Sequence, residues 1–141
     1  MVGQAARFVY AFQVLHHGES IRMNHAEILS LPLVDDEVII ELREIMDDQF
    51  ASLIHLFLND LPIQLGRLQT AVAQGDAAEI FQTAHKLKSS CGSIGAARLA
   101  ELIRRLEQAG RQQILDDAVE LLQHIQTVAD ETVACLQAHV D

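Results

Sequence analysis

The chain has 141 residues, enough for a single domain with its own core, and half of them are hydrophobic. Its formal net charge of −10 argues against nucleic acid as a partner, because the phosphate backbone would be repelled. Only two residues are proline, and apolar side chains recur at a spacing near 3.6, which predicts an all-α protein. No apolar run approaches the roughly 18 residues of a transmembrane helix, so we expect no membrane association.

Residues 1–30 are predicted to be an N-terminal extension that is poorly ordered or results from a misassigned start. The apolar run at 8–12 is short, and no small-residue cleavage site follows it, so it is a poor secretory signal. Met23 offers a natural alternative start. We therefore expect a cytoplasmic protein whose folded domain covers residues 31–141.

A short amphipathic helix is predicted over residues 36–46, after the helix-starting Asp35. A longer helix follows over about 47–74 and ends at Gly75. Pro62 lies inside it, but the apolar stripe keeps its phase across the proline, which predicts one kinked helix rather than two. The inner stripe of this helix comprises Phe50, Ile54, Phe57, Leu61, Leu65, Leu68 and Val72.

Three further helices are predicted in the second half of the chain. They cover about 77–92, about 96–109 with an end at Gly110, and about 113–139. Four long helices with short connections predict an up-down-up-down bundle, with the short helix capping one end. The inner face of the last helix is expected to comprise Ile114, Ala118, Leu121, Ile125, Val128, Thr132 and either Cys135 or Leu136.

The helix over 77–92 carries the most distinctive group of residues. His85 lies on the shoulder of the apolar stripe, and Lys88 follows it one turn later. Phe81 and Gly92 share this shoulder, one turn before and two turns after the histidine. Lys86 and Lys88 are the only lysines of the chain, and both lie within three residues of His85. We interpret this placement as functional.

These residue types suit phosphoryl transfer. A neutral imidazole is nucleophilic, and an exposed one can accept a phosphoryl group on a ring nitrogen. The product carries extra negative charge, which Lys88 would offset as a mobile point charge. The alternative is an ordinary exposed histidine among surface lysines, because charged helix flanks are usually only solvated faces.

The stretch 84–96 resembles the signature of histidine phosphotransfer (HPt) domains of two-component signalling, usually written A-H-x-L-K-G-x-x-x-x-[LIV]-G-[AL]. Ser89 stands where the family most often has glycine, and its small side chain should leave the ring accessible. The resemblance runs from about Leu33 through Leu106-Glu107 to about Val140, roughly three quarters of the chain. The residues that match the signature are Ala84, His85, Leu87, Lys88, Ile94, Gly95 and Ala96.

The resemblance implies a protein that relays a phosphoryl group between aspartates on receiver domains, from a hybrid sensor kinase to a response regulator. His85 would be the phosphorylated histidine, Lys88 would stabilise the phosphate charge, and Lys86 would assist from the adjoining side. The protein would be a carrier without kinase activity, with no metal or cofactor of its own. Mg²⁺ would come from the acidic pocket of the receiver. We expect a monomer.

A receiver must reach His85 over its neighbours, so small or uncharged side chains are expected around the ring. Phe81, Gln82, Ser89 and Gly92 fit this description and are predicted to form the partner-binding surface. The sequence holds no Gly-rich phosphate loop and no Glu-x-x-His pair that would indicate an enzyme. The remaining alternative is a helical bundle, structural or degenerate, that binds receivers or other proteins without transferring phosphate.

Overall fold

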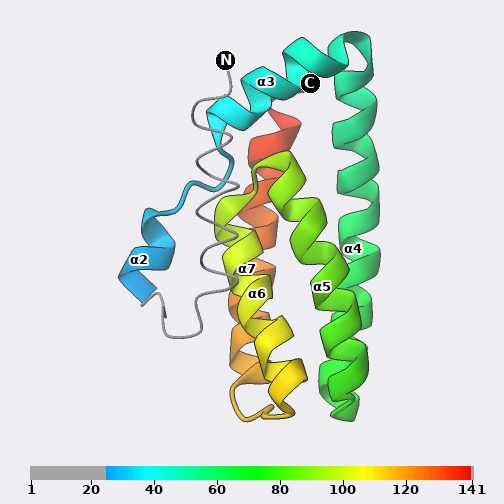
Figure 1. Cartoon of the computed structure of the whole chain (residues 1–141), viewed down its shortest axis with the longest axis vertical. Helices are drawn as coiled ribbons and strands as arrows, with labels where there is room; N and C mark the ends of the chain where they lie inside the picture. The colour runs from blue at the N-terminus through cyan, green and yellow to red at the C-terminus, as the bar shows by residue number, and fades with distance from the viewer. Residues whose placement is uncertain (1–24, 141) are drawn as a thin grey trace.

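The computed structural model describes residues 25–140, and all regular secondary structure in this part of the chain is helical. Four long helices run side by side in alternating directions, and a shorter helix lies across one end of them (Figure 1). The predicted all-α bundle is confirmed. In chain order the elements are α2 (His25–Ser30), α3 (Asp36–Met46), the 3₁₀ turn η1 (Asp47–Gln49), α4 (Phe50–Gln74), α5 (Ala77–Ile94), α6 (Ala97–Gln112) and α7 (Ala118–Gln137).

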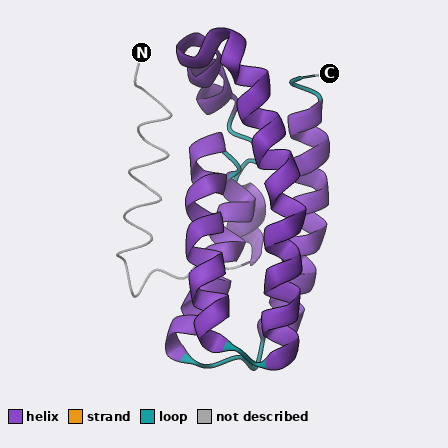
Figure 2. Cartoon of the chain, turned by 90° about the vertical axis from the view of Figure 1, so that its right-hand side faces the viewer, coloured by secondary structure: helices purple, strands orange, loops and turns teal. Residues whose placement is uncertain are grey.

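The long helices α4 to α7 are joined by short connections (Figure 2). Each helix buries one apolar face against the others, and α5 and α6 share the most extensive contact. No helix between residues 25 and 140 is long and apolar enough to span a membrane. The largest fully buried apolar side chains are Ile39, Ile54, Leu61, Leu68, Ile80, Leu87, Leu99, Ile103, Leu106, Ile125 and Leu136.

The capping helix α3 has the bounds predicted from the sequence, and the side chain of Asp35 accepts a hydrogen bond from the backbone N–H of Glu37 at 3.0 Å. Gly95, in the turn between α5 and α6, holds this helix in place. Its carbonyl accepts a hydrogen bond from the N–H of Asp35 at 2.8 Å. Its φ is +84°, and a Cβ there would lie 2.9 Å from Cβ of Val38. Only glycine meets both conditions without strain.

The helix α4 passes through Pro62 without a break, which confirms the prediction of one continuous helix. It begins at Phe50 rather than near Asp47, because residues 47–49 form η1. It ends as predicted at Gly75, which adopts the left-handed conformation with a φ of +66°.

The predicted end of α6 at Gly110 is wrong. The helix continues to Gln112 and ends at Gln113, which has a φ of +58°. Gly110 is buried instead against the start of α5, where a Cβ would lie 2.8 Å from the carbonyl oxygen of Ala77 and from the backbone nitrogen of Phe81. The glycine therefore permits close approach of two helices.

The predicted start of the last helix at residue 113 is also wrong. Because Gln113 ends α6 in the left-handed conformation, residues 114–117 are needed to reverse the chain, and α7 begins at Ala118. Ile114, which the sequence placed on the buried face, is exposed in this connection. Ala118, Ile125, Val128, Thr132 and Leu136 are buried as predicted.

The helix α2 packs beside α6, and its Ile28 is buried. Arg98 of α6 binds the C-terminal end of α2 and the residue that follows this helix. Its Nε donates to the carbonyl of Leu31 at 3.0 Å, and its Nη2 donates to the carbonyl of Leu29 at 2.8 Å. The two interpretations of the N-terminal extension, poor order and a misassigned start, concern mainly residues 1–24, which lie outside the described residues.

Candidate functional site

His85 is exposed at the middle of α5, as its place beside the apolar stripe predicted. Its side chain is 52% exposed, whereas Ala84 and Leu87 on the apolar stripe of the same helix are buried. Phe81, one turn earlier on the same helix, stacks on the imidazole with ring centroids 5.8 Å apart. One face of the ring is thus covered by the protein while much of the side chain remains accessible.

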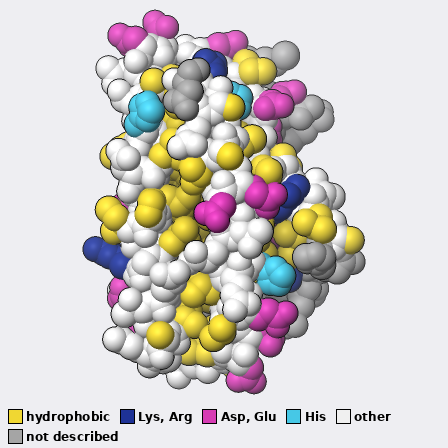
Figure 3. Space-filling model, turned by 180° about the vertical axis from the view of Figure 1, so that it is seen from behind, with side chains coloured by type: hydrophobic (Ala, Val, Ile, Leu, Met, Phe, Trp, Pro, Cys, Tyr) yellow, Lys and Arg dark blue, Asp and Glu magenta, His cyan; other side chains and the backbone are white. Residues whose placement is uncertain are grey.

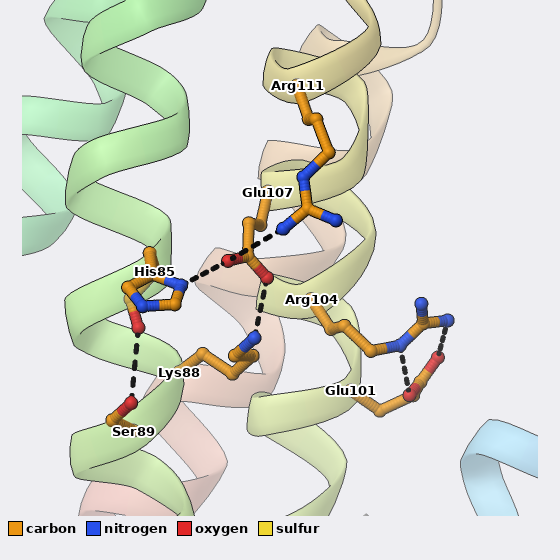
Figure 4. Close-up of polar contacts among 7 residues, drawn as sticks. All are labelled: His85, Lys88, Ser89, Glu101, Arg104, Glu107 and Arg111. Atoms are coloured by element: carbon orange, nitrogen blue, oxygen red, sulfur yellow. Dashed lines mark hydrogen bonds and ion pairs between the residues drawn. The ribbon is translucent and has the colours of Figure 1, made fainter. Parts of the chain in front are cut away.

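A buried glutamate from the neighbouring helix contacts this histidine. Glu107 of α6 has a side chain only 2% exposed, and its Oε2 lies 2.5 Å from Nδ1 of His85. Its Oε1 accepts a hydrogen bond from Nζ of Lys88 at 2.7 Å. Figure 4 shows this one carboxylate bridging the imidazole and the ammonium, both of which project from α5 towards α6.

The electrostatics of the site keep the Glu107 carboxylate ionised. Burial acts to raise its pKa, but the hydrogen bonds and charges of Lys88 and His85 outweigh burial and hold the pKa of Glu107 below its ordinary value. An ionised carboxylate can only accept hydrogen bonds. Nδ1 of His85 must therefore carry the proton it donates to Glu107, so in the neutral tautomer the free lone pair lies on Nε2.

Lys88 differs from the mobile, solvated cation that the sequence suggested. Its side chain is buried, with 4% exposed, and its ammonium is held by Glu107. A buried lysine requires such a partner, because an unpaired charge away from water is costly. Lys86 is exposed and does not share the helix face of His85 and Lys88.

Arg111 is a second cation at the site that the sequence analysis did not single out. It lies one turn after Glu107 on α6, and its Nη2 is 3.9 Å from Oε2 of that carboxylate. Its guanidinium also lies over the ring of Phe81, 5.2 Å from the centroid. Its side chain is half exposed, so this arginine can contact a ligand of His85 from the solvent side.

The residues predicted to surround the histidine form an open surface on α5. Gln82 and Ser89 are exposed, and Phe81 and Gly92 are half-buried. A Cβ added at Gly92 would meet nothing within 4 Å, so there is open space for a side chain two turns beyond His85. Its use in binding a partner stays a prediction.

Residues 52–135 match the family described as the Hpt domain, and these residues include α5, α6 and the whole site. The chain belongs to the Hpt domain family. Members of this family carry phosphoryl groups in two-component systems. The match confirms the family that the signature around His85 suggested.

Two solved structures of Hpt proteins resemble the chain. Histidine-containing phosphotransfer protein B from Pseudomonas aeruginosa PAO1 is 29% identical, with a TM-score of 0.76, over 79% of this chain and 96% of that one. The HPT domain of a sensor hybrid histidine kinase from Shewanella is 17% identical, with a TM-score of 0.64, over 77% and 93% of the two chains. The second likeness concerns the fold alone. No curated protein sequence matches the chain.

Proposed function

We propose that this Hpt protein relays a phosphoryl group between aspartates of two receiver domains, one in a hybrid sensor kinase and one in a response regulator, through a phosphohistidine at His85. The observation that carries the proposal is the contact between Nδ1 of His85 and the ionised Glu107. It fixes the tautomer and leaves Nε2 as the nucleophile on an exposed ring.

The transfer step follows from this arrangement. The lone pair of Nε2 attacks the phosphorus of an aspartyl phosphate, a nitrogen–phosphorus bond forms, and the bond between phosphorus and the aspartate oxygen breaks. The aspartate leaves as a carboxylate, and no proton has to be removed from the attacking nitrogen. The ring becomes cationic, and Glu107 stabilises that charge through the hydrogen bond from Nδ1. The reverse attack by another aspartate restores the neutral ring.

The receiver supplies what the site itself lacks. Transfer of a phosphoryl group requires cations on its oxygens. We assign Mg²⁺ to the acidic pocket of the receiver, as the resemblance implied. On the Hpt side, two cations lie near His85. Lys88 is held by its hydrogen bond to Glu107, and the guanidinium of Arg111 lies over the ring of Phe81. The receiver identities, the direction of flow and the cytoplasmic location stay predictions.

The experiment that tests this proposal is incubation with a phosphorylated receiver domain. Label should pass from the receiver to the protein, in a form that is labile to acid and stable to base, as expected for phosphohistidine. A second, unphosphorylated receiver should then remove the label. A protein that binds both receivers and never becomes labelled would instead be the degenerate alternative, and the proposal would be rejected.

The three cations near His85 should affect the transfer rate in the order Lys88, Arg111, Lys86. Lys88→Met removes a charge next to the ring and keeps most of the buried volume, so it should slow transfer by at least about tenfold. Arg111→Ala should have a smaller effect because its guanidinium is half exposed. Lys86→Ala should leave the rate within about twofold, because an exposed charge is screened by solvent.

Single-turnover transfer from one phosphorylated receiver measures all three rates under the same conditions. Arg67→Ala is a matched control, because this exposed arginine lies on α4, outside the site. Equal rates for the Lys88 and Lys86 variants would contradict the assignment of Lys88.

A glutamate at Gly92 should block the receiver without disturbing the bundle. The position has open space for a side chain, so Gly92→Glu should keep the melting temperature of the parent within a few degrees. Its carboxylate would stand two turns from His85 and repel the acidic pocket of a receiver, so we expect affinity to fall by at least about tenfold. Calorimetric titration and a thermal melt give both numbers, and Gly92→Ala is the control. Unchanged affinity would place the docking surface elsewhere.

A further inference from the structure

The helix α4 presents an uncharged stripe to solvent on the side opposite the core. We define the outer stripe by seven residues that alternate at spacings of three and four, so that they share one helix face. Six are exposed and Gly66 is half-buried. Hydrophobic side chains reach the rear surface of the molecule, where α4 and α7 lie (Figure 3). The members of the outer stripe are Ser52, Leu56, Asn59, Ile63, Gly66, Thr70 and Ala73.

This face is unlike an ordinary solvated helix surface. Charged residues make up 21% of the chain, yet α4 has only Asp60 and Arg67 among its 25 residues. Leu56 and Ile63, one heptad apart, are 68% and 57% exposed. A solvent-facing helix side is normally polar or charged, so large aliphatic side chains spaced by seven residues indicate a surface that packs against another helix.

The outer stripe is complementary to itself when two copies of α4 run antiparallel. Leu56 then faces Ala73 of the second copy, and Ile63 faces Gly66 of the second copy. Each large side chain thus meets a small one, which lets helix backbones approach closely. A Cβ at Gly66 would meet nothing within 4 Å, so the space above the glycine is open for the incoming isoleucine.

The two charges of α4 fit the same arrangement. Asp60 and Arg67 lie on the same edge of the outer stripe, about 10 Å apart along the helix axis, too far to pair within one helix. In the antiparallel register Asp60 lies about two residues, or roughly 3 Å along the axis, from the level of Arg67 of the second copy, within reach of that long side chain, and the two-fold axis repeats the pair. Asp60 accepts a hydrogen bond from Gln64 at 3.1 Å, and Arg67 makes no ion pair within residues 25–140.

We propose that the protein forms a two-fold symmetric homodimer through the outer stripes of antiparallel α4 helices. This replaces the monomer expected from the sequence. His85 lies on α5 and faces α6, so both phosphoryl sites stay open in the dimer. Seven residues a side are fewer than the roughly 20 to 30 of a standard interface, so we expect a dissociation constant in the micromolar range. The proposal does not depend on the proposed phosphotransfer.

Charge reversal tests both the partner and the register. Sedimentation equilibrium of the full chain, from low micromolar to millimolar concentrations, should show a monomer–dimer equilibrium. Asp60→Arg and Arg67→Asp should each raise the dissociation constant at least about tenfold, because each sets like charges opposite one another twice. The double variant Asp60→Arg/Arg67→Asp should return it to within about threefold of the parent. A parent that stays monomeric, or a double variant that is not rescued, would overturn the proposal.

Two further comparisons fix the surface and the orientation. Ile63→Glu should abolish dimerisation, whereas Val119→Glu, at an equally exposed apolar position on α7, should not change it.

In a Cys135→Ser background, Leu56→Cys/Ala73→Cys should form intermolecular disulfides, and either cysteine alone should not. Crosslinking by Leu56→Cys alone would indicate parallel helices and reject the proposed register. Phosphate transfer to Ile63→Glu should match that to the parent, so failure of the dimer and failure of the phosphotransfer proposal are distinguishable.

Discussion

Replacing His85 with glutamine is expected to abolish phosphoryl acceptance while the bundle stays folded. Glutamine has no nucleophilic ring nitrogen, but its amide can still donate a hydrogen bond to Glu107, and Lys88 continues to pair with that carboxylate. The side chain is half exposed, so the free energy of unfolding should change by about 1 kcal/mol or less.

Label transfer from a phosphorylated receiver, together with a denaturant titration, measures both parts of this prediction. His55→Gln is a matched control, because His55 is also an exposed helical histidine and lies on α4. It should accept label at the rate of the parent. Residual acid-labile label on His85→Gln would show that another residue carries the phosphoryl group.

Replacing Glu107 with alanine is expected to cause the largest loss of stability of any single change at the site. The variant leaves the ammonium of Lys88 buried without its carboxylate, which typically costs about 3 to 5 kcal/mol. Removing both charges in Glu107→Ala/Lys88→Met should recover much of that loss, because the buried ammonium is removed together with its carboxylate. Urea titrations of the parent, the two single variants and the double variant give the coupling energy. A double variant no more stable than Glu107→Ala would show that the loss arises from a cavity instead.

The stabilisation from Glu107 should also depend on pH in a defined direction. The pKa of Glu107 in the folded protein is below its ordinary value of 4.5, so the unfolded chain binds its proton first as the pH falls. The stabilisation that Glu107 contributes to folding is complete at neutral pH and is lost progressively below about pH 4.5. The difference in unfolding free energy between the parent and Glu107→Gln should therefore narrow in that acid range.

Helical periodicity was enough to predict most of the fold. The phase of the apolar stripe across Pro62 gave one continuous helix, and the bounds of α3 agree with the structure. The exposure of His85 followed from its rotation away from the buried stripe. These properties depend on the local order of residues along one helix, which the sequence contains directly.

The partner of the histidine could not be found in the same way, because it lies on another helix. Periodicity tells which residues share a face but not which helix covers the shoulder of that face. A signal was present: Ile103, Glu107 and Gly110 follow the i, i+4, i+7 spacing of a buried face, and a glutamate on such a face is rarely unpaired. The role of Gly110 was missed for the same reason, since its close approach to α5 involves a second helix.

Within residues 25–140, the polar and aromatic side chains that contact the imidazole belong to a single hairpin of helices, α5 and α6, joined by the tight turn at Gly95. His85 and Glu107 are only 22 residues apart in the chain. Contacts of such short sequence separation form quickly during folding, because little loop-closure entropy is lost before they form. The hairpin can therefore assemble the histidine with its carboxylate at an early stage, before the long-range contacts between α4 and α7 close the bundle.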